Sequence, residues 1–468
     1  LLFGYTIESG TKWKYETTTW NPGDRSLLTT AYDVLAAPAK SIRIDATHST
    51  IASGAKLDLS GGGEAVAWEF TAGPGGKSDA LRASTSTFAI VPNWNGFSAT
   101  DSGLQQYYNV TAAGSTYSPL PSLKAGDSIS LAANPAGVSG TYVLLPARYA
   151  LLPDAYLVTV KTTNDGVLNR TKTQTEGSWL VSGTRLAANA DGSTTPYSQR
   201  PLTLELANSS VTAKRAKYVT TTASEFFYDT DGANLPGDAG QLTAIGHNSL
   251  VFDPAIVAMR QAEIAAADGR TRAGRGLELD LAAPKLLITD NSTAPDASWS
   301  VLDQTKLNAL GASSLLLGGV KTVSGATTYI DTIATNVQIS NSGSALAGSE
   351  LMATASNNLT VLSGSHIDTS GSAETRDIKL KPIPGTDAVN VDNYGAFLRA
   401  AEGYQATVSR VVSGTGSVNQ AKGDLNIEAG TSVAGNSLIF DATHTNTLDG
   451  SISLGKRQSD DARGSGGA

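Results

Sequence analysis

The four histidines of this chain, His48, His247, His366 and His444, are the first side chains to examine for chemistry, and they lie far apart in the sequence. His48 and His444 each end the tetrapeptide Asp-Ala-Thr-His, so they hold equivalent places in a repeated segment. No His-x-Glu, His-Glu-x-x-His or Gly-x-Ser-x-Gly arrangement is present, and zinc or serine hydrolases need such patterns. We therefore interpret the paired histidines as hydrogen-bonding groups of stacked turns, and we expect no catalytic residue and no cofactor.

The segment DTDGANLPGD, residues 229–238, is a candidate calcium loop. Asp229, Asp231 and Asp238 could supply carboxylate oxygens, with Gly232 turning the chain. Ala233 offers no ligand, and the terminal Glu of an EF-hand is missing. A plain turn that leads into the strand QLTAIG is therefore the favoured interpretation.

The acidic residues keep an enzyme open as the alternative. Polysaccharide lyases and hydrolases bring two or three Asp or Glu side chains together in a groove. The sequence does not tell whether Asp45, Asp58 or Asp368 faces such a groove. Most carboxylates here stand in turns beside Gly or Ser, which favours a protein that is not an enzyme. The alternative is a β-helical carbohydrate-active enzyme or a phage tail-spike depolymerase.

The composition indicates the elements that must position these residues. Among 468 residues there are 48 Gly, 16% are charged, 40% are apolar and 6% are aromatic. Such a chain is typical of many short strands separated by turns, with small side chains stacked layer on layer. It is not typical of disorder, which needs low hydrophobicity or a strong charge imbalance.

Two pairs of segments repeat without a fixed period. SIRIDATHSTIASGAKLDLSG at 41–61 resembles SLIFDATHTNTLDGSISLG at 437–455, and NNLTVLSGSHIDTSG at 357–371 resembles KGDLNIEAGTSVAG at 422–435. The matched positions of the second pair are Leu359 with Leu425, Val361 with Ile427, Gly364 with Gly430 and Ile367 with Val433. Each unit predicts a strand, a Gly turn and a second strand, and stacking would bury the apolar face that one unit leaves exposed. We expect a right-handed parallel β-helix, or β-solenoid.

One region interrupts this pattern. Residues 64–200 hold thirteen aromatic residues and eight of the seventeen prolines, which suit an insertion better than regular rungs. We expect rungs at 1–63, an insertion or embellished region at 64–200, and rungs with short helical decorations at 201–468. Helices are predicted at Asp253 to Asp268 and at Thr305 to Ala312. The candidate ligand-binding residues of the insertion are Trp68, Trp94, Tyr107 and Tyr108.

Charge and cysteine content limit the partners. The net charge of −8 disfavours nucleic acid, and no apolar run is long enough to span a membrane. The absence of cysteine fits export through the periplasm as an unfolded chain. The opening LLFGYTIESG has no initiator Met and no signal-peptide layout, so we expect an internal segment of a longer protein.

Several phrases resemble filamentous-haemagglutinin-family exoproteins, the passengers of two-partner secretion in Gram-negative bacteria. These phrases are AKLDLSGGGEAVAWEFTAGPGGKSDAL at 55–81, YVLLPARYALLPDAYLV at 142–158, DQTKLNALGASSLLLGGV at 303–320 and LTVLSGSHIDTSGSA at 359–373. The resemblance implies a right-handed parallel β-helix, secretion through an outer-membrane transporter, and adhesion at the cell surface. The expected function is a rod-like spacer that binds host or cell-surface ligands such as a glycan or matrix receptor.

Overall fold

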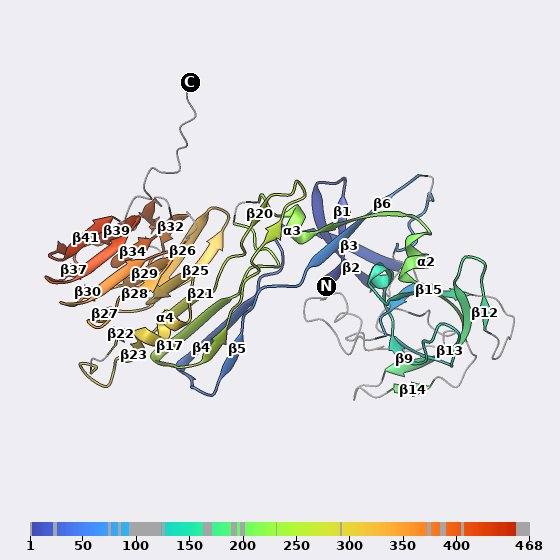
Figure 1. The fold of residues 1–468 in the computed structure, drawn as a ribbon, viewed down its shortest axis with the longest axis horizontal. Coiled ribbons are helices and arrows are strands. Elements are labelled where there is room, and N and C mark those ends of the chain that lie inside the picture. Colours follow the sequence, from blue (N-terminus) through green and yellow to red (C-terminus); the bar gives the residue numbers. More distant parts are fainter. Residues whose placement is uncertain are drawn as a thin grey trace, which may run out of the picture. The chain divides into compact units, whose positions relative to one another are not determined.

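The computed structural model shows an all-β protein with a few short helices. It describes residues 2–21, 26–73, 76–82, 86–92, 123, 127–161, 171–188, 194–196, 202–230, 232–290, 293–371, 376–383, 390–403 and 407–454. Two compact units are present, and each is described by itself (Figure 1). Unit 1 comprises Leu1–Leu35 and Glu64–Phe226, and unit 2 comprises Ala36–Gly63 and Phe227–Ala468.

Unit 1 contains a mixed five-stranded sheet in the order β16-β6-β1-β2-β3. Its strands are β1 (Leu2–Glu8), β2 (Lys12–Asn21), β3 (Ser26–Asp33), β6 (Ala65–Thr71) and β16 (Lys217–Thr222). Strands β1, β2 and β3 form two antiparallel pairs, whereas β6 runs parallel to β1 and antiparallel to β16. This pairing joins three distant parts of the chain in one sheet.

The second sheet of unit 1 is antiparallel and has nine strands. They are β7 (Thr87–Ile90), β8 (Ser128–Leu131), β9 (Gly140–Val143), β10 (Leu145–Pro146), β11 (Tyr156–Lys161), β12 (Lys172–Thr173), β13 (Trp179–Ala188), β14 (Thr194–Pro196) and β15 (Leu202–Asn208). The main order is β10-β7-β11-β15-β13-β8-β9, with β12 and β14 beside β13. The strands at its two ends, β9 and β10, are neighbours in the chain, so the sheet curls into a near-barrel.

The two faces of the near-barrel have separate apolar cores. Phe88, Ile129 and Leu204 belong to one cluster, while Trp68, Ala89 and Leu157 belong to the other. The second cluster also takes in residues of the 3-10 helix η1 (Ala147–Leu151) and the helix α2 (Ser209–Ala213). A further short helix, α3 (Ala223–Phe226), ends the unit.

Unit 2 is built on a seven-stranded sheet in the order β39-β34-β29-β24-β21-β17-β4. Its strands are β4 (Ser41–Ile51), β17 (Gln241–Phe252), β21 (Glu278–Ala282), β24 (Ser314–Leu317), β29 (Glu350–Ala355), β34 (Ala396–Ala401) and β39 (Ser437–Ala442). The strands from β4 to β29 are parallel, and β34 is antiparallel to both of its neighbours. The sheet is therefore mixed.

Two further sheets of unit 2 are wholly parallel (Figure 1). The six-stranded sheet contains β22 (Lys285–Thr289), β23 (Ser300–Asp303), β27 (Asn336–Ser340), β30 (Asn358–Val361), β37 (Asp424–Ile427) and β40 (Asn446–Leu448). The four-stranded parallel sheet contains β28 (Leu346–Gly348), β31 (His366–Thr369), β38 (Ser432–Gly435) and β41 (Ser451–Leu454). A parallel pair joins β5 (Lys56–Asp58) to β18 (Ala255–Val257).

The register of these sheets confirms the match between the repeats at 357–371 and 422–435. Leu359 pairs with Leu425 and Val361 with Ile427, while Ile367 pairs with Val433 in the next sheet. All six side chains are buried in one apolar cluster that also includes inward-facing residues of the seven-stranded sheet. Alternation at period two therefore sends one set of residues into a shared core, as the sequence predicts.

A mixed sheet, here named the cover sheet, packs on the outer face of the seven-stranded sheet. It consists of β25 (Gly319–Ser324), β26 (Thr327–Thr332), β32 (Asp377–Leu380) and β35 (Val408–Arg410). Ile330, Ile378 and Leu380 of the cover sheet share an apolar cluster with Met352 and Phe397. The remaining elements are β19 (Ile264–Ala265), β20 (Thr271–Arg272), β33 (Asn390–Val391), β36 (Ser413–Gly414) and the helix α4 (Gln304–Ala309).

The structure divides the chain differently from the expected ranges. Residues 1–35 were expected as rungs, but they lie in unit 1 because β1 pairs with β6. Residues 202–226 also lie in unit 1, where β15 and β16 complete its two sheets. The expected break near residue 64 coincides with a unit boundary.

The two helix predictions have opposite outcomes. The predicted helix at 253–268 is wrong, since Ala255–Val257 forms β18 and pairs with β5, which buries part of Ile256 against the core. The predicted helix at 305–312 is confirmed as α4. Asp303 caps it by accepting a hydrogen bond from the Lys306 amide, and Gly311 follows it with φ of 59°.

Candidate functional site

Charged side chains lie on the buried outer face of the seven-stranded sheet, beneath the cover sheet. In β21, Leu279 and Leu281 face the main core, so Glu278 and Asp280 alternate to the outer face. Side chains of neighbouring strands extend this arrangement. We name the group the outer polar row, and its members are Gln241, Glu278, Asp280, Ser314, Lys321, Glu350, Arg399 and Ser437.

Lys321 and Asp280 are the most deeply buried ion pair of this row. Their side chains are 3% and 0% exposed, and Nζ of Lys321 lies 3.3 Å from Oδ1 of Asp280. The ammonium also donates to Oγ of Ser314 at 2.8 Å and lies 3.8 Å from Oε2 of Glu278. The pair joins β25 of the cover sheet to β21 of the seven-stranded sheet.

The second ion pair of the row joins two strands of the seven-stranded sheet. Nε of Arg399 donates to Glu350 Oε1 at 2.7 Å, and Nη1 donates to Ser437 Oγ at 3.1 Å. Glu350 accepts a further hydrogen bond from Ser314 at 2.6 Å. The Arg399 side chain is 1% exposed, so each of its partners compensates part of the cost of burying a guanidinium.

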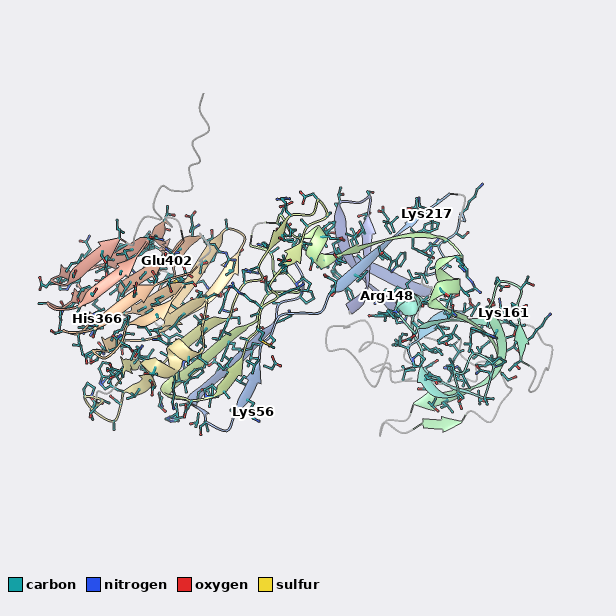
Figure 2. All side chains as sticks on the ribbon, viewed as in Figure 1. Lys56, Arg148, Lys161, Lys217, His366 and Glu402 are labelled. Atoms are coloured by element: carbon teal, nitrogen blue, oxygen red, sulfur yellow. The ribbon has the colours of Figure 1, made fainter. Side chains whose placement is uncertain are left out.

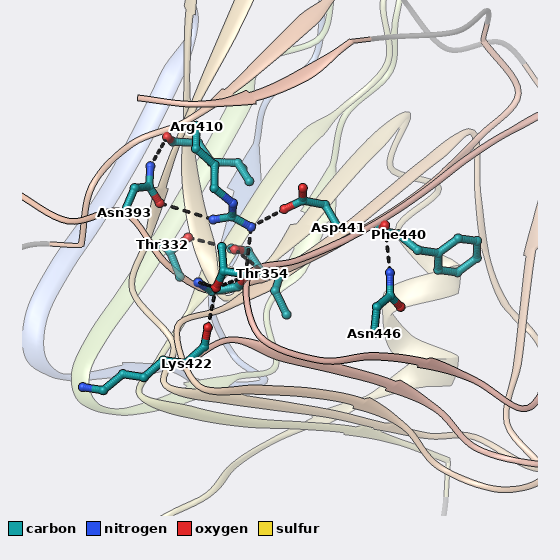
Figure 3. Close-up of polar contacts among 12 residues, drawn as sticks. Thr332, Thr354, Asn393, Arg410, Lys422, Phe440, Asp441 and Asn446 are labelled. Carbon is teal, nitrogen blue, oxygen red and sulfur yellow. Dashed lines mark hydrogen bonds and ion pairs between the residues drawn. The ribbon is translucent and has the colours of Figure 1, made fainter. Parts of the chain in front are cut away.

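A separate cluster secures the other side of the cover sheet (Figure 3). Arg410 of β35 forms an ion pair with Asp441 of β39 and donates to the carbonyl of Gly395 at 2.9 Å. Its guanidinium also donates to Asn393 Oδ1 at 3.2 Å, and the Asn393 amide bonds the carbonyls of Leu380 and Val411. Polar contacts thus hold both β25 and β35 in place.

Burial shapes the protonation of the Lys321–Asp280 pair. Burial raises the pKa of the Asp280 carboxyl, and the positive charge of Lys321 opposes the rise without cancelling it. Burial lowers the pKa of Lys321, but the carboxylates of Asp280, Glu278 and Glu350 outweigh that effect and raise it. The site therefore holds a carboxyl with an increased tendency to be protonated directly beside a primary amine.

The histidines do not come together as a site. His48 Nδ1 contacts Ser249 Oγ at 3.0 Å, and His444 Nδ1 contacts Asp424 Oδ1 at 2.6 Å. The His48 contact joins the paired strands β4 and β17 and not two turns, which corrects the stacked-turn interpretation for this residue. The His444 contact joins the segment after β39 to β37. His247 contacts Asp45 at 2.8 Å, and His366 lies on β31 (Figure 2).

Asp229 and Asp238, two of the candidate calcium ligands, each form an ion pair with an arginine. Asp229 pairs with Arg270, while Asp238 accepts the amides of Leu235 and Arg275 and pairs with the Arg275 guanidinium. Asp231 lies outside the described residues. Within the described ranges, no group of three His, Cys, Asp or Glu residues could hold a metal ion.

The candidate ligand-binding aromatic residues are placed only in part. Trp68 of β6 is 5% exposed, and its ring meets that of Tyr218 edge-on with the ring centres 5.3 Å apart. Trp68 is therefore a core residue. Trp94, Tyr107 and Tyr108 lie outside the described residues. The phrase LLPARYALLP at 144–153 contains η1, and Arg148 lies in this helix (Figure 2). The Arg148 guanidinium carbon lies 5.4 and 5.2 Å from the ring centres of Tyr15 and Tyr149.

The acidic residues considered for an enzyme lie on different sheets. Asp45 is in β4, where it pairs with Arg43 and His247, while Asp58 is in β5 and Asp368 is in β31. Hydrogen bonds from Arg43 and His247 outweigh desolvation and lower the pKa of Asp45. A general acid needs the opposite shift, so Asp45 is suited to an ion pair.

Sequence reasoning missed the outer polar row, although a signal was present. Asp280 stands in the segment LELDLAA and Arg399 in AFLRAA, so each is a charged residue within an apolar run. Such a residue must be paired when its strand is buried on both faces. The partners Lys321 and Glu350 are tens of residues away. The pattern could therefore indicate that Asp280 and Arg399 need an oppositely charged partner, but not which residue supplies it.

Comparison of the chain with protein-family models, with curated proteins and with solved structures finds no match. Among the described residues, no helix is long and apolar enough to cross a membrane. What the chain does must therefore be argued from its own residues.

Proposed function

We propose that unit 2 is a right-handed parallel β-helix and that the chain is a structural and adhesive segment of a secreted surface protein. The observation that carries the proposal is the repeated, in-register passage of the chain through two parallel sheets. It goes from β27 to β28, from β30 to β31, from β37 to β38 and from β40 to β41. Each passage adds one strand to each sheet, which is how a rod lengthens.

The distribution of charge supports a structural role over catalysis. The buried charged groups of unit 2 are used in structural pairs. Lys321 with Asp280 joins two sheets, and Arg399 with Glu350 joins two strands of one sheet. Three neighbouring outward positions of the six-stranded sheet, Gln338, Thr360 and Asn426, carry neutral polar side chains. A rod with this surface can space a binding module from a cell.

The family phrases extend the proposal to location and partners. They favour a filamentous-haemagglutinin-type exoprotein of a Gram-negative bacterium, exported by an outer-membrane two-partner secretion transporter and exposed at the cell surface. The ligand class that fits is a host glycan or a matrix receptor. Trp94, Tyr107 and Tyr108 are the first residues to test, because aromatic rings bind sugars and proteins through large apolar faces.

The test applies the full chain to arrays of glycans and matrix proteins, and in parallel to a panel of polysaccharides assayed for cleavage. The proposal predicts saturable binding without cleavage, reduced at least tenfold in W94A/Y107A/Y108A. The control is T360A/N426A, which changes the rod surface and should keep the same affinity. Release of oligosaccharides by the purified chain would replace the adhesive proposal with the carbohydrate-active enzyme.

A further inference from the structure

The carboxyl group of Asp280 is held in an asymmetric environment. Its Oδ2 accepts two hydrogen bonds, from the backbone amide of Lys321 at 2.9 Å and from Nε2 of Gln241 at 3.1 Å. Its Oδ1 accepts no hydrogen bond from the described residues, although the Lys321 ammonium lies 3.3 Å away. One oxygen is thus fixed by two donors while the other faces an amine.

This arrangement matches what amide formation requires. Two fixed donors at Oδ2 stabilise the negative charge that develops on that oxygen when a nucleophile adds to the carboxyl carbon. The amine is held 3.3 Å from Oδ1 of the same carboxyl, and both side chains are buried. This proximity removes most of the entropic cost of a bimolecular reaction. Oδ1, bound by neither donor, is the oxygen that can leave.

The row also contains a proton acceptor. Oε2 of Glu278 lies 3.8 Å from Nζ of Lys321, and the Glu278 side chain is 20% exposed, so it can exchange protons with solvent. The raised pKa of Lys321 means that the amine must lose a proton before it attacks. The raised pKa of Asp280 favours the neutral acid, which is the form that an amine can attack.

We propose that Lys321 and Asp280 join in an intramolecular isopeptide bond, with Glu278 as the base. Glu278 accepts a proton from the Lys321 ammonium, and Nζ then bonds to Cγ of Asp280. The C–Oδ1 bond breaks, and Oδ1 leaves with two protons as water, one from the carboxylic acid and one from the nitrogen. Glu278 returns its proton to solvent, and no oxidant or further reactant is needed.

The bond would have a clear structural consequence. It would tie β25 of the cover sheet to β21 through Lys321 and Asp280, which are 41 positions apart in the chain. Closing a loop of this length covalently restricts the unfolded chain in the same way as a disulfide. The cross-link uses no cysteine, and the chain contains none.

The test is the intact mass of the purified full chain, followed by fragmentation of its proteolytic peptides. The inference predicts a mass lower than that of the free residues by one water, and a branched peptide that joins Asp280 to Lys321. K321R and E278Q should both show the full mass. The control is K381R, in the half-buried Lys381–Asp331 pair at 2.8 Å, which should keep the loss of one water.

The outcomes separate cleanly. A wild-type chain with the full mass overturns the isopeptide bond, whatever the variants do. A wild-type chain that lacks one water, together with E278Q that also lacks it, overturns the role of Glu278 alone. Because the readout is a mass, it is independent of whether the chain binds a ligand.

Discussion

Gly364 and Gly430 occupy the same position in two neighbouring turns and share one left-handed backbone conformation, with φ of 81° and 82°. The turns follow β30 and β37, whose residues pair in parallel. A Cβ atom added to Gly430 would lie 3.3 Å from Oγ of Ser363 in the neighbouring turn. The stack therefore needs glycine here both for its backbone and for the close approach of the next turn.

Replacing this glycine should destabilise unit 2. Gly430→Ala forces an L-residue into a left-handed conformation and presses Cβ on the next turn, so we expect a loss of about 1–2 kcal/mol. The matched control is Gly54→Ala in the same unit, where a Cβ meets no atom within 4 Å and φ is not left-handed. Urea unfolding of both variants measures the difference, and an equal effect would contradict the account of the turns.

Removing one partner of the Arg399–Glu350 pair should destabilise unit 2 strongly, whereas replacing both partners by apolar residues should destabilise it little. Arg399→Met leaves the Glu350 carboxylate, which is 15% exposed, without its cation, and we expect a loss of about 3–5 kcal/mol. The double variant R399M/E350M should recover most of this loss, since neither charge of this pair remains. As control, Lys381→Met breaks the Lys381–Asp331 pair, which is far less buried, and should cost under about 1 kcal/mol. A double variant as unstable as the single one would contradict the pairing.

Unit 1 should lose stability in acid through Glu205. Burial raises the pKa of this carboxyl, but the bonds and charges of Lys161 and Arg215 outweigh burial and leave the pKa below its usual 4.5. A lowered pKa in the folded state gives stability that is present above the usual pKa and is lost as the pH falls through the folded value. The melting temperature of Glu205→Gln should therefore vary less with pH than wild type between about pH 6 and about pH 3. Parallel curves for the two proteins would rule out this role.

The sequence predicts those parts of the fold that leave a local pattern, and it does not predict those that depend on pairing between distant segments. Leu359 could be matched with Leu425 because alternation and a glycine at fixed spacing leave a local trace in both segments. The helix predicted at 253–268 is wrong. An Asp cap, a Pro in the first turn and good helix formers after it fit a helix locally, but the pairing of β18 with β5 decides the outcome. The placement of residues 1–35 beside β6 likewise depends on a parallel pairing that no local pattern records.

The candidate site was less predictable than the fold. Its buried pairs join residues such as Glu350 and Arg399, which lie 49 positions apart, and a single sequence does not record such pairings. A charge within an apolar run can be seen in LELDLAA and AFLRAA, so a search for buried charges would have found Asp280 and Arg399.

The central claim, that unit 2 is a stack of parallel rungs in a fixed register, can be tested with cysteine pairs, because the chain has no cysteine of its own. Thr360 pairs with Asn426 across β30 and β37. Adjacent strands lie about 4.8 Å apart, which is within reach of a disulfide, whereas a position two residues further along the partner strand lies about 7–8 Å away. The measurement is the extent of disulfide formation in T360C/N426C under mild oxidation, with T360C/E428C as the off-register control. The account predicts nearly complete oxidation of T360C/N426C and little in the control, and equal or reversed yields would contradict it.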